Sequence, residues 1–357
     1  MNQLLQAQLK IVPEMPTLLQ KRYKILMAIL LAGEIGRRSL SELVRLTERE
    51  TRKETDLLNQ QGLIKIRSVG MEISQEGKDV LDTLKDVVHE WSGLIQLEQE
   101  LQKSYNLSRV IIVPGDSEKN DLSKSLLGQE AAKQLDCLTQ SKQIVAVTGG
   151  GTIASIGEFL SQYVKQKTLT YVAARGGIGE EVQMQANTIA ASFATATNGS
   201  SRTLYLPDHL SEEAYSTMMK EPVIKEMLDL YDQTSVVIHG IGDALEMANR
   251  RNSTAEEIEA IKEAGAVGEA FGYYFNKDGK AVHRIRTVGI QLKQLESVQH
   301  LLAVAGGTSK ATAIGSYLKH APPQTVLITD EGAAKELARQ NEDIKLGGKL
   351  DDFKISD

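Results

Sequence analysis

The sequence predicts an α/β protein in which a small winged helix-turn-helix precedes a large, mostly parallel, doubly wound sheet. The first module is indicated by two capping motifs followed by a hairpin pattern within residues 39–73. The sheet is indicated by short β-branched runs that alternate with helical stretches over residues 110–329. Such alternation is typical of a parallel sheet with helices on both faces.

The composition is that of an ordinary globular protein. The chain has 357 residues, 41% hydrophobic and 25% charged, which is enough for two domains with their own cores. Its single cysteine, Cys137, excludes an intrachain disulfide and a cysteine-rich metal site. The sequence shows neither a basic-then-apolar leader nor an apolar run of about 18 residues, so we expect a cytoplasmic protein that contacts no membrane.

Charge is spread unevenly along the chain. The net charge is −6, yet residues 20–70 hold eleven Lys and Arg against six Asp and Glu. That surplus leaves about −11 for the remainder. The sequence therefore predicts a basic module attached to an acidic body, rather than a protein that coats nucleic acid along its whole length.

Two short helices are expected in the basic module. Leucine and isoleucine recur at helical spacing over residues 16–32. Residues 39–42 (Ser-Leu-Ser-Glu) then fit a capping box, and residues 47–50 (Thr-Glu-Arg-Glu) fit a second one. The spacing of these two helix starts predicts two helices separated by a tight turn.

A hairpin pattern follows the second of these helices, which Gly62 should end. Residues 63–67 and 71–73 read as two strands around a short turn. Helix, turn, helix and hairpin together predict a winged helix-turn-helix.

Successive residues of a helix are rotated by about 100°, and this rotation gives the second helix a cationic face and a packing face. In a helix-turn-helix protein it would lie in the major groove, where arginine pairs with guanine and lysine meets phosphate or guanine. A solvated helix face is the alternative, but the neighbouring capping motifs and hairpin favour DNA binding. The predicted base-facing residues are Arg49, Arg52 and Lys53, the predicted backbone contacts are Arg37 and Arg38, and Thr51, Thr55 and Leu58 form the packing face.

A heptad seam follows the hairpin. Its members are spaced four, three, four and three residues apart, and Gly93 interrupts the helix near its end. Two readings stay open: the seam packs on its own chain, or it pairs two copies of the protein, as dimeric helix-turn-helix proteins require. The seam residues are Val80, Leu84, Val87, Trp91 and Leu94.

The large domain begins after a second helix, at a strand near residue 110. The expected domains are residues 1–75 (DNA-binding), 76–106 (helical linker and oligomerisation), 107–339 (effector-binding) and 340–357 (a polar, loose tail). The expected strands are residues 110–113, 144–147, 169–172, 203–206, 236–239, 301–305 and 326–329, with a hairpin at 273–286.

Four of these strands end in glycine-rich segments, and this is the most informative feature of the chain. Ligands of such sheets sit at the carboxyl ends of the strands, where glycines let the backbone approach a phosphate. Any one nearby cation is more often a surface residue, but their shared position predicts an electropositive floor with donors for two phosphates. The cations are Arg175, Arg250, Arg251 and Lys310.

The segment 149–154 (Gly-Gly-Gly-Thr-Ile-Ala) also matches the G-x-G-x-x-A dinucleotide fingerprint. That interpretation needs an acidic residue at the end of the next strand, where the chain has Arg175 instead. An NADP-binding protein would tolerate the arginine, so an NADP sensor of the same architecture stays as an alternative.

The order of the motifs resembles one family. After the winged helix-turn-helix come TGGGT at residues 148–152, AARGGIGE at 173–180, HGIG…NRRN at 239–252, EAFGYYFN at 269–276 and AVAGGTSKA at 303–311. Over residues 1–339 the chain resembles the SorC family of sugar-responsive bacterial transcription regulators. The effector domain of that family is similar to the sugar-phosphate isomerase and glucosamine-phosphate deaminase fold.

The resemblance, which is closest to one branch of the family, implies a function and a ligand site. It implies a repressor of the operon for the lower, triose-phosphate part of glycolysis, induced by fructose 1,6-bisphosphate. Gln185 and Glu269 would bond sugar hydroxyls. Gly151 stands where the family pattern has a hydroxyl residue, which would leave the N–H groups of Gly150 and Gly151 as donors. The matching positions are Gly149, Gly150, Gly151, Thr152, Arg175, Gln185, Arg250, Arg251, Glu269 and Lys310.

An enzyme of the same fold is the competing class. It would need a carboxylate base, for which Glu269 is the one site carboxylate carried over, with His239 or His283 as helpers. The sequence shows no Ser-His-Asp set and no H-E-x-x-H motif. We therefore expect no catalytic residues, no metal and no cofactor besides the allosteric ligand. The expected partners are operator DNA and further copies of the chain, which would form a dimer or a tetramer.

Overall fold

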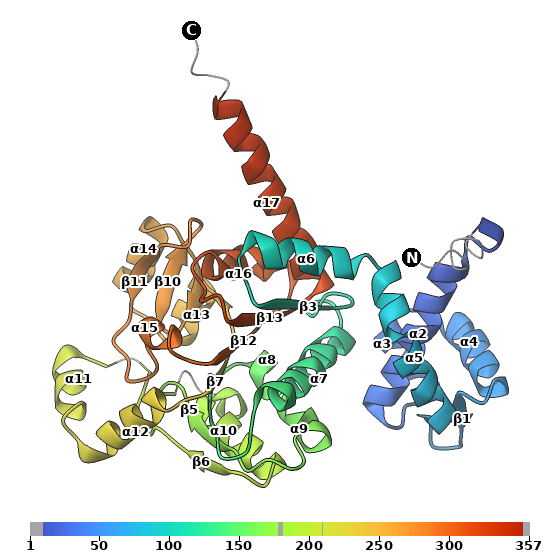
Figure 1. Cartoon of the computed structure of the whole chain (residues 1–357), viewed down its shortest axis with the longest axis horizontal. Coiled ribbons are helices and arrows are strands. Elements are labelled where there is room, and N and C mark those ends of the chain that lie inside the picture. The colour runs from blue at the N-terminus through green and yellow to red at the C-terminus, as the bar shows by residue number, and fades with distance from the viewer. Residues whose placement is uncertain (1–9, 178–180, 209, 353–357) are drawn as a thin grey trace. The chain divides into compact units, whose positions relative to one another are not determined.

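A computed structural model of the chain describes residues 10–177, 181–208 and 210–352, with the helix backbone alone over 344–352 (Figure 1). The opening residues 1–9, which belong to the family resemblance, lie outside the described part. The same holds for residues 178–180 of the AARGGIGE motif and for 353–357 of the predicted tail.

The chain divides into two compact units. The small unit comprises residues 1–97 and 120–122, and the large unit comprises 98–119 and 123–357. The segment 76–106, predicted as a separate linker, is shared between them. Among the described residues no helix is long and apolar enough to cross a membrane.

The small unit has the predicted winged helix-turn-helix order. The strands pair antiparallel, and Gly62, at φ 74°, follows the second helix of the motif. The packing face is confirmed, because Thr51, Thr55 and Leu58 are all buried. The elements are α2 (Met15–Ala32), α3 (Arg37–Val44), α4 (Glu48–Gln60), β1 (Ile64–Ile66), β2 (Met71–Ile73) and α5 (Gln75–Trp91).

Of the two predicted capping boxes, the structure contains the second. Thr47 Oγ1 accepts from the N–H of Glu50 at 3.2 Å, and Glu50 Oε2 accepts from the N–H of Thr47 at 3.1 Å. The box predicted at residues 39–42 is wrong, since α3 already begins at Arg37, after the extended Gly36. Its Ser41 hydroxyl instead donates to a carbonyl one turn back.

The heptad seam runs along α5 but does not continue into the next helix. Gly93 has a φ of 74° and separates α5 from α6 (Leu94–Ser104). Helix α5 packs against α2 and buries Leu81 and Val88, whereas the seam residues on α5 are half-buried. The seam therefore flanks the packing face of α5.

A seven-stranded parallel sheet organises the large unit, with helices on both sides as predicted (Figure 1). Its strand order is β3-β13-β12-β7-β4-β5-β6. The sixth strand along the chain was misplaced from the sequence: it lies at Ser200–Arg202, not at residues 203–206. The strands are β3 (Arg109–Val113), β4 (Ile144–Val147), β5 (Thr170–Ala173), β6 (Ser200–Arg202), β7 (Val236–His239), β12 (His300–Val304) and β13 (Thr325–Asp330).

A four-stranded antiparallel sheet packs beside the large one, in the order β11-β10-β9-β8. It contains the predicted hairpin, whose turn has Gly279 at φ 82°. Helix α16 packs against β9 and β10. The strands are β8 (Gly242–Asp243), β9 (Ala266–Ala270), β10 (Tyr273–Asn276) and β11 (Ala281–Arg284).

The predicted loose tail is largely helical, because α17 continues from the last strand through Asp352. Tyr105 Oη donates to Asn341 Oδ1 at 3.1 Å, which fastens the helix to the end of α6. The remaining helices of the large unit are α7 (Asp121–Leu138), α8 (Gly151–Ala154), α9 (Gly157–Tyr163), α10 (Ala186–Ala196), α11 (Glu212–Met218), α12 (Pro222–Asp232), α13 (Ala244–Arg250), α14 (Ala255–Glu263), α15 (Leu292–Leu295), α16 (Ala311–Leu318) and α17 (Glu331–Asp352), with 3-10 turns η1 (Val182–Met184) and η2 (Thr308–Lys310).

Candidate functional site

The four strands that end in glycine-rich segments are neighbours in the parallel sheet. They are β12, β7, β4 and β5, in that order. The chain proceeds from β4 to β5 on one side and from β7 to β12 on the other, so strand order reverses between β4 and β7. A crevice at such a switch point is where open α/β sheets bind ligands.

One cavity lies at these strand ends, and all ten candidate effector residues line it. The structure thus brings together the strand ends that the sequence predicted to converge. Their part in binding a ligand stays a prediction. The ten are Gly149, Gly150, Gly151, Thr152, Arg175, Gln185, Arg250, Arg251, Glu269 and Lys310.

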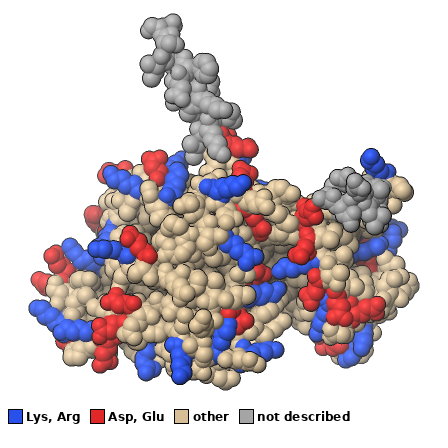
Figure 2. Space-filling model, viewed as in Figure 1, with Lys and Arg blue, Asp and Glu red and all other residues tan. Residues whose placement is uncertain are grey.

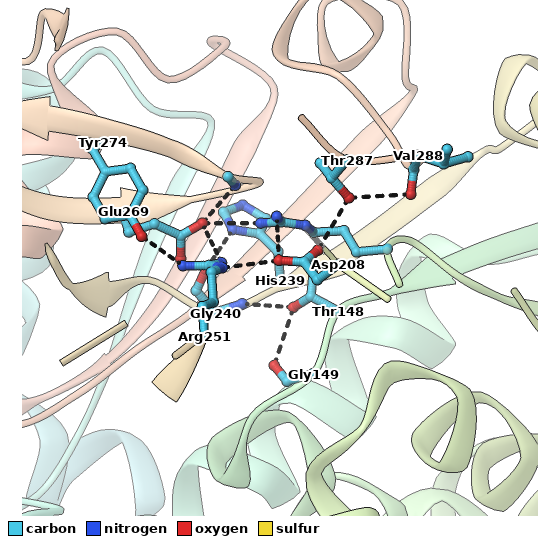
Figure 3. Close-up of polar contacts among 12 residues, drawn as sticks. Thr148, Gly149, Asp208, His239, Gly240, Arg251, Glu269, Tyr274, Thr287 and Val288 are labelled. Atoms are coloured by element: carbon cyan, nitrogen blue, oxygen red, sulfur yellow. Dashed lines mark hydrogen bonds and ion pairs between the residues drawn. The ribbon is translucent and has the colours of Figure 1, made fainter. Parts of the chain in front are cut away.

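The glycine loop after β4 is held to the loop after β7. Thr148 Oγ1 accepts from the N–H of Gly240 at 3.2 Å (Figure 3). Gly149 leaves no room for a side chain, since a Cβ there would lie 2.7 Å from the carbonyl oxygen of Met184. Gly150, at φ 116°, donates its N–H to that same carbonyl at 2.9 Å. Of the two N–H groups expected to serve an anion, the one on Gly150 is therefore engaged in this conformation.

Two arginines and two carboxylates form a buried cluster at the cavity, which we call the floor quartet: Arg175, Arg251, Asp208 and Glu269. Both arginines and Glu269 line the cavity, and Figure 3 shows Arg251, Asp208 and Glu269 side by side. Arg175 contacts Asp208 at 2.8 Å and Glu269 at 2.9 Å, and Arg251 contacts the same two carboxylates at 2.9 Å each. The four side chains are 5% exposed or less, which makes these pairs structural elements and not surface contacts.

The floor quartet links several parts of the large unit. Arg175 follows β5, Asp208 follows β6, Arg251 follows α13, and Glu269 lies in β9. The hydroxyl of Thr287 also donates to Asp208, and Arg251 Nη1 donates to the hydroxyl of Tyr274 at 3.1 Å. Burial disfavours the charged form of Arg251. The nearby carboxylates of Glu269 and Asp208 outweigh that effect and raise the pKa of Arg251 above its ordinary value.

The predicted electropositive floor is wrong for two of its four cations. Arg175 and Arg251 are matched by an equal number of carboxylates, so the floor quartet is neutral as a unit. Figure 2 shows basic and acidic side chains interspersed over the visible surface of the large unit, with no continuous field of one sign. Of the four predicted cations, Arg250 and Lys310 are thus the two that remain available to a ligand.

Those two cations lie at the rim of the cavity with Glu246, and we call these three residues the rim triad. Arg250 and Lys310 have 37% and 32% of their side chains exposed. Glu246 lies 3.9 Å from each of them. Between rim and floor, the cavity offers guanidinium, ammonium, carboxylate and backbone groups, which suits a ligand that carries both phosphates and hydroxyls.

Several lining or neighbouring residues were missed from the sequence. Asp208 has no local motif, although a buried arginine pair requires a carboxylate partner. Glu246 had a visible signal, four residues before Arg250 on one helix face. Lys124 was unrecognisable, because it comes from α7; its Nζ lies 3.8 Å from where a Cβ on Gly151 would stand. The described residues contain no cluster of three or more potential metal ligands.

His239 lies below the cavity at the end of β7 and is fully buried. Its Nδ1 donates to the carbonyl of Gly240 at 3.1 Å, so its Nε2 accepts from the hydroxyl of Tyr317 at 3.2 Å. Burial lowers the pKa of His239 to about 4, although the Gly240 carbonyl and Glu269 act in the opposite direction. A neutral imidazole with both ring nitrogens hydrogen-bonded inside the fold has a structural role. His283 lies on β11, against the ring of Tyr274.

This pKa predicts an acid-sensitive stability. Between about pH 6.5 and pH 4 the unfolded chain binds a proton at His239 that the folded chain does not, so stability is complete above pH 6.5 and falls as pH falls. We expect a loss of about 1 kcal/mol between pH 7.5 and 5.5. Urea unfolding at both pH values should show this loss of stability in the wild type and in the control His320→Gln, which changes an exposed histidine. The loss should be smaller in His239→Gln. An equal loss in His239→Gln would contradict the assignment.

The predicted DNA-binding residues lie on the small unit. Arg49, Arg52 and Lys53 are exposed on α4, and none has an ion pair within 4 Å in the described part of the chain. Arg37 and Arg38 open α3, where they lie 3.6 Å from Asp56 and 3.3 Å from Glu42. The structure therefore leaves the α4 cations available to a polyanion.

Helix α4 is anchored by a carboxylate that the sequence did not single out. Glu54 is buried and contacts Lys21 at 2.6 Å and Arg22 at 2.8 Å, both on α2. Two cations of the basic module are thereby used inside the fold. The anchor fixes which face of α4 is presented outward.

A winged helix-turn-helix joined to an α/β unit with a polar cavity at its switch point defines a class, that of ligand-responsive DNA-binding regulators. Two family matches agree with it. Residues 18–88 match the "CggR N-terminal DNA binding domain", and residues 89–339 match the "Putative sugar-binding domain".

Full-length relatives give the same result. The chain is 45% identical over 339 residues to the central glycolytic genes regulator of Bacillus subtilis, covering 95% of this chain and 99% of that one. The regulator of that name from Priestia megaterium is 45% identical over 340 residues, with the same coverage. The chain therefore belongs to the SorC family of sugar-responsive transcriptional regulators.

Solved structures agree with the fold. A SorC-family regulator from Enterococcus faecalis, at 42% identity, superposes with a TM-score of 0.64 over 68% of this chain and 99% of its own. The full-length sorbitol operon regulator from Klebsiella pneumoniae, at 18% identity, superposes with a TM-score of 0.62 over 85% of this chain and 94% of its own, which supports the fold alone. Since the close relatives are DNA-binding regulators, this chain is a regulator and not an enzyme.

Proposed function

We propose that this protein represses the operon for the triose-phosphate part of glycolysis and that fructose 1,6-bisphosphate releases it from its operator. The observation that carries the proposal is the single cavity lined by all ten residues that match the family's ligand site. The names of the two 45% identical relatives support the choice of operon. The cytoplasm, where glycolytic metabolites occur, is the compartment that this function requires.

The cavity suits a bisphosphate in two ways. Arg250 and Lys310 offer partly solvated charge at the rim, and the glycine loop offers backbone at close range. Gln185, which precedes α10, lines the cavity, and its amide oxygen lies 2.6 Å from where a Cβ on Gly177 would stand. An amide and a carboxylate can distinguish a sugar by its hydroxyls, which phosphate-binding cations alone cannot do.

The switch is an allosteric change in subunit association. In the unliganded protein, copies pair through the large unit and the seam on α5, and paired α4 helices bind a repeated operator. Bisphosphate weakens that pairing. A coupling of about 1–3 kcal/mol shifts operator affinity by roughly 5- to 150-fold, and linkage requires DNA to weaken bisphosphate binding by the same factor. Equal bisphosphate affinity with and without operator, at fixed salt, would rule out this mechanism.

Lys310→Ala tests the proposed ligand. Loss of a charged hydrogen bond to phosphate should weaken fructose 1,6-bisphosphate binding by about ten- to hundredfold, because such bonds contribute about 1.5–3 kcal/mol. Operator affinity without effector should be unchanged, while release by bisphosphate is lost. Isothermal titration and operator gel shifts measure both. Lys262→Ala, which removes an exposed lysine of α14, is the matched control and should behave as the wild type.

The NADP-sensor alternative is separated by the ligand that raises the melting temperature. A ligand that binds only the folded state raises the free energy of unfolding, and the gain grows with the ratio of ligand concentration to dissociation constant. We expect stabilisation by fructose 1,6-bisphosphate and none by NADP. The opposite result would replace the proposed effector with a dinucleotide.

A further inference from the structure

Glu246 lies in the cavity where an anionic ligand would make its contacts. Its Oε1 is 3.9 Å from Arg250 Nη1 and its Oε2 is 3.9 Å from Lys310 Nζ. One carboxylate thus faces both cations that the floor quartet leaves available. Carboxylate and phosphate pair with the same cationic side chains, so a phosphate group that contacted these two cations would compete with Glu246.

Glu246 can leave this position at little cost to the fold. Its side chain is 47% exposed, and both ion pairs are long and partly solvated, so each contributes little to stability. Its backbone is held independently, because Asp243 Oδ1 accepts from the N–H groups of Leu245 and Glu246 at 3.0 Å each. The side chain is therefore free to exchange while its helix stays in place.

The other carboxylate that lines the cavity cannot do the same. Glu269 is 5% exposed and contacts both arginines of the floor quartet at 2.9 Å. Moving it would leave buried charge without a partner, which costs far more than breaking a surface pair. Among the described residues that line the cavity, Glu246 and Glu269 are the carboxylates, and only Glu246 is exchangeable.

We propose that Glu246 is a built-in competitor of the effector: its carboxylate holds Arg250 and Lys310 in the empty site and is displaced to solvent by a phosphate group. This rests on the proposed function, that the cavity takes a phosphorylated sugar. A doubly charged phosphate outcompetes one carboxylate for the two cations, whereas a singly charged ligand does not. Glu246 thereby raises the effector concentration needed for release and selects for phosphate esters.

Glu246→Gln in the full-length protein tests the proposal, because it keeps the shape of the side chain and removes its charge. One unit charge pair at 4 Å in water is worth about 1 kcal/mol, so we expect fructose 1,6-bisphosphate to bind about fivefold more tightly, with a smaller gain at high salt. Glu259→Gln is the matched control: Glu259 is exposed on α14, pairs with Lys262 at 3.6 Å, and does not line the cavity.

Isothermal titration at fixed low ionic strength measures both variants against the wild type, and unliganded melting temperatures check that all three are folded. Tighter binding in Glu246→Gln alone supports the competitor. Equal binding overturns it, and weaker binding overturns it in favour of Glu246 as a direct ligand contact. If the wild type itself binds no fructose 1,6-bisphosphate, the proposed effector fails, and a titration with inorganic phosphate then decides whether Glu246 competes with phosphate at all.

Discussion

Arg175→Ala is expected to destabilise the large unit by about 3–5 kcal/mol, the usual cost of breaking a buried ion pair from one side. Without the guanidinium, Asp208 and Glu269 share Arg251 as their remaining arginine partner in the floor quartet, and one negative charge is left uncompensated in a site that is 5% exposed or less. Denaturant unfolding of the full chain should show a clearly lower midpoint. An unchanged midpoint would mean that the floor quartet is not structural.

A double-mutant cycle measures the interaction energy between Arg175 and Asp208. Asp208→Asn removes the opposite charge, and the double variant Arg175→Ala/Asp208→Asn should lose less stability than the sum of the two single changes. Lys310→Ala serves as the surface control and should change stability by no more than about 0.5 kcal/mol. A lost effector response in Arg175→Ala therefore cannot be read as a lost ligand contact, and Lys310→Ala is the cleaner test.

Arg49→Ala/Arg52→Ala is expected to abolish specific operator binding at working concentrations. Each arginine that reads a base contributes about 1–3 kcal/mol, so loss of both should weaken the operator complex at least about thirtyfold. The folded state should be unaffected, because both side chains are exposed and the described residues offer them no ion pair within 4 Å. Fluorescence anisotropy with operator and scrambled DNA at one salt concentration measures the effect.

Two controls test whether the expected loss of operator binding is specific to α4. Lys262→Ala on the large unit removes a positive charge without touching α4, and its operator affinity should stay within twofold of the wild type. Bisphosphate binding by the double variant should also be normal. If Arg49→Ala/Arg52→Ala binds operator as the wild type does, then the cationic face of α4 is simply a solvated surface.

Local patterns were enough to predict the elements that carry the cavity. The β-branched run at residues 144–147 became β4 with the predicted bounds, since it is a short apolar segment followed at once by glycines. The capping box at Thr47 was also readable, because its two partners, Thr47 and Glu50, are only three positions apart in the sequence. By contrast, β6 has the sequence Ser-Ser-Arg, so nothing apolar marked it.

Information that depends on long-range contacts was out of reach. Strand order is set by pairing between distant segments, and it is this order that makes β12, β7, β4 and β5 neighbours. The partners of Arg175 come from residues 33 and 94 positions away in the chain. Residue type alone therefore suggested four free cations, when two of them are neutralised inside the fold.

The division between the floor quartet and the rim triad has a consequence for altering ligand choice by design. Every charge of the quartet is shared between two partners, so a single substitution there perturbs folding before it perturbs preference. The rim triad is partly solvated and joined by long contacts, so its three positions accept new side chains. A biosensor for a metabolite of different charge should accordingly be built by varying Glu246, Arg250 and Lys310 while the four residues of the floor quartet are kept unchanged.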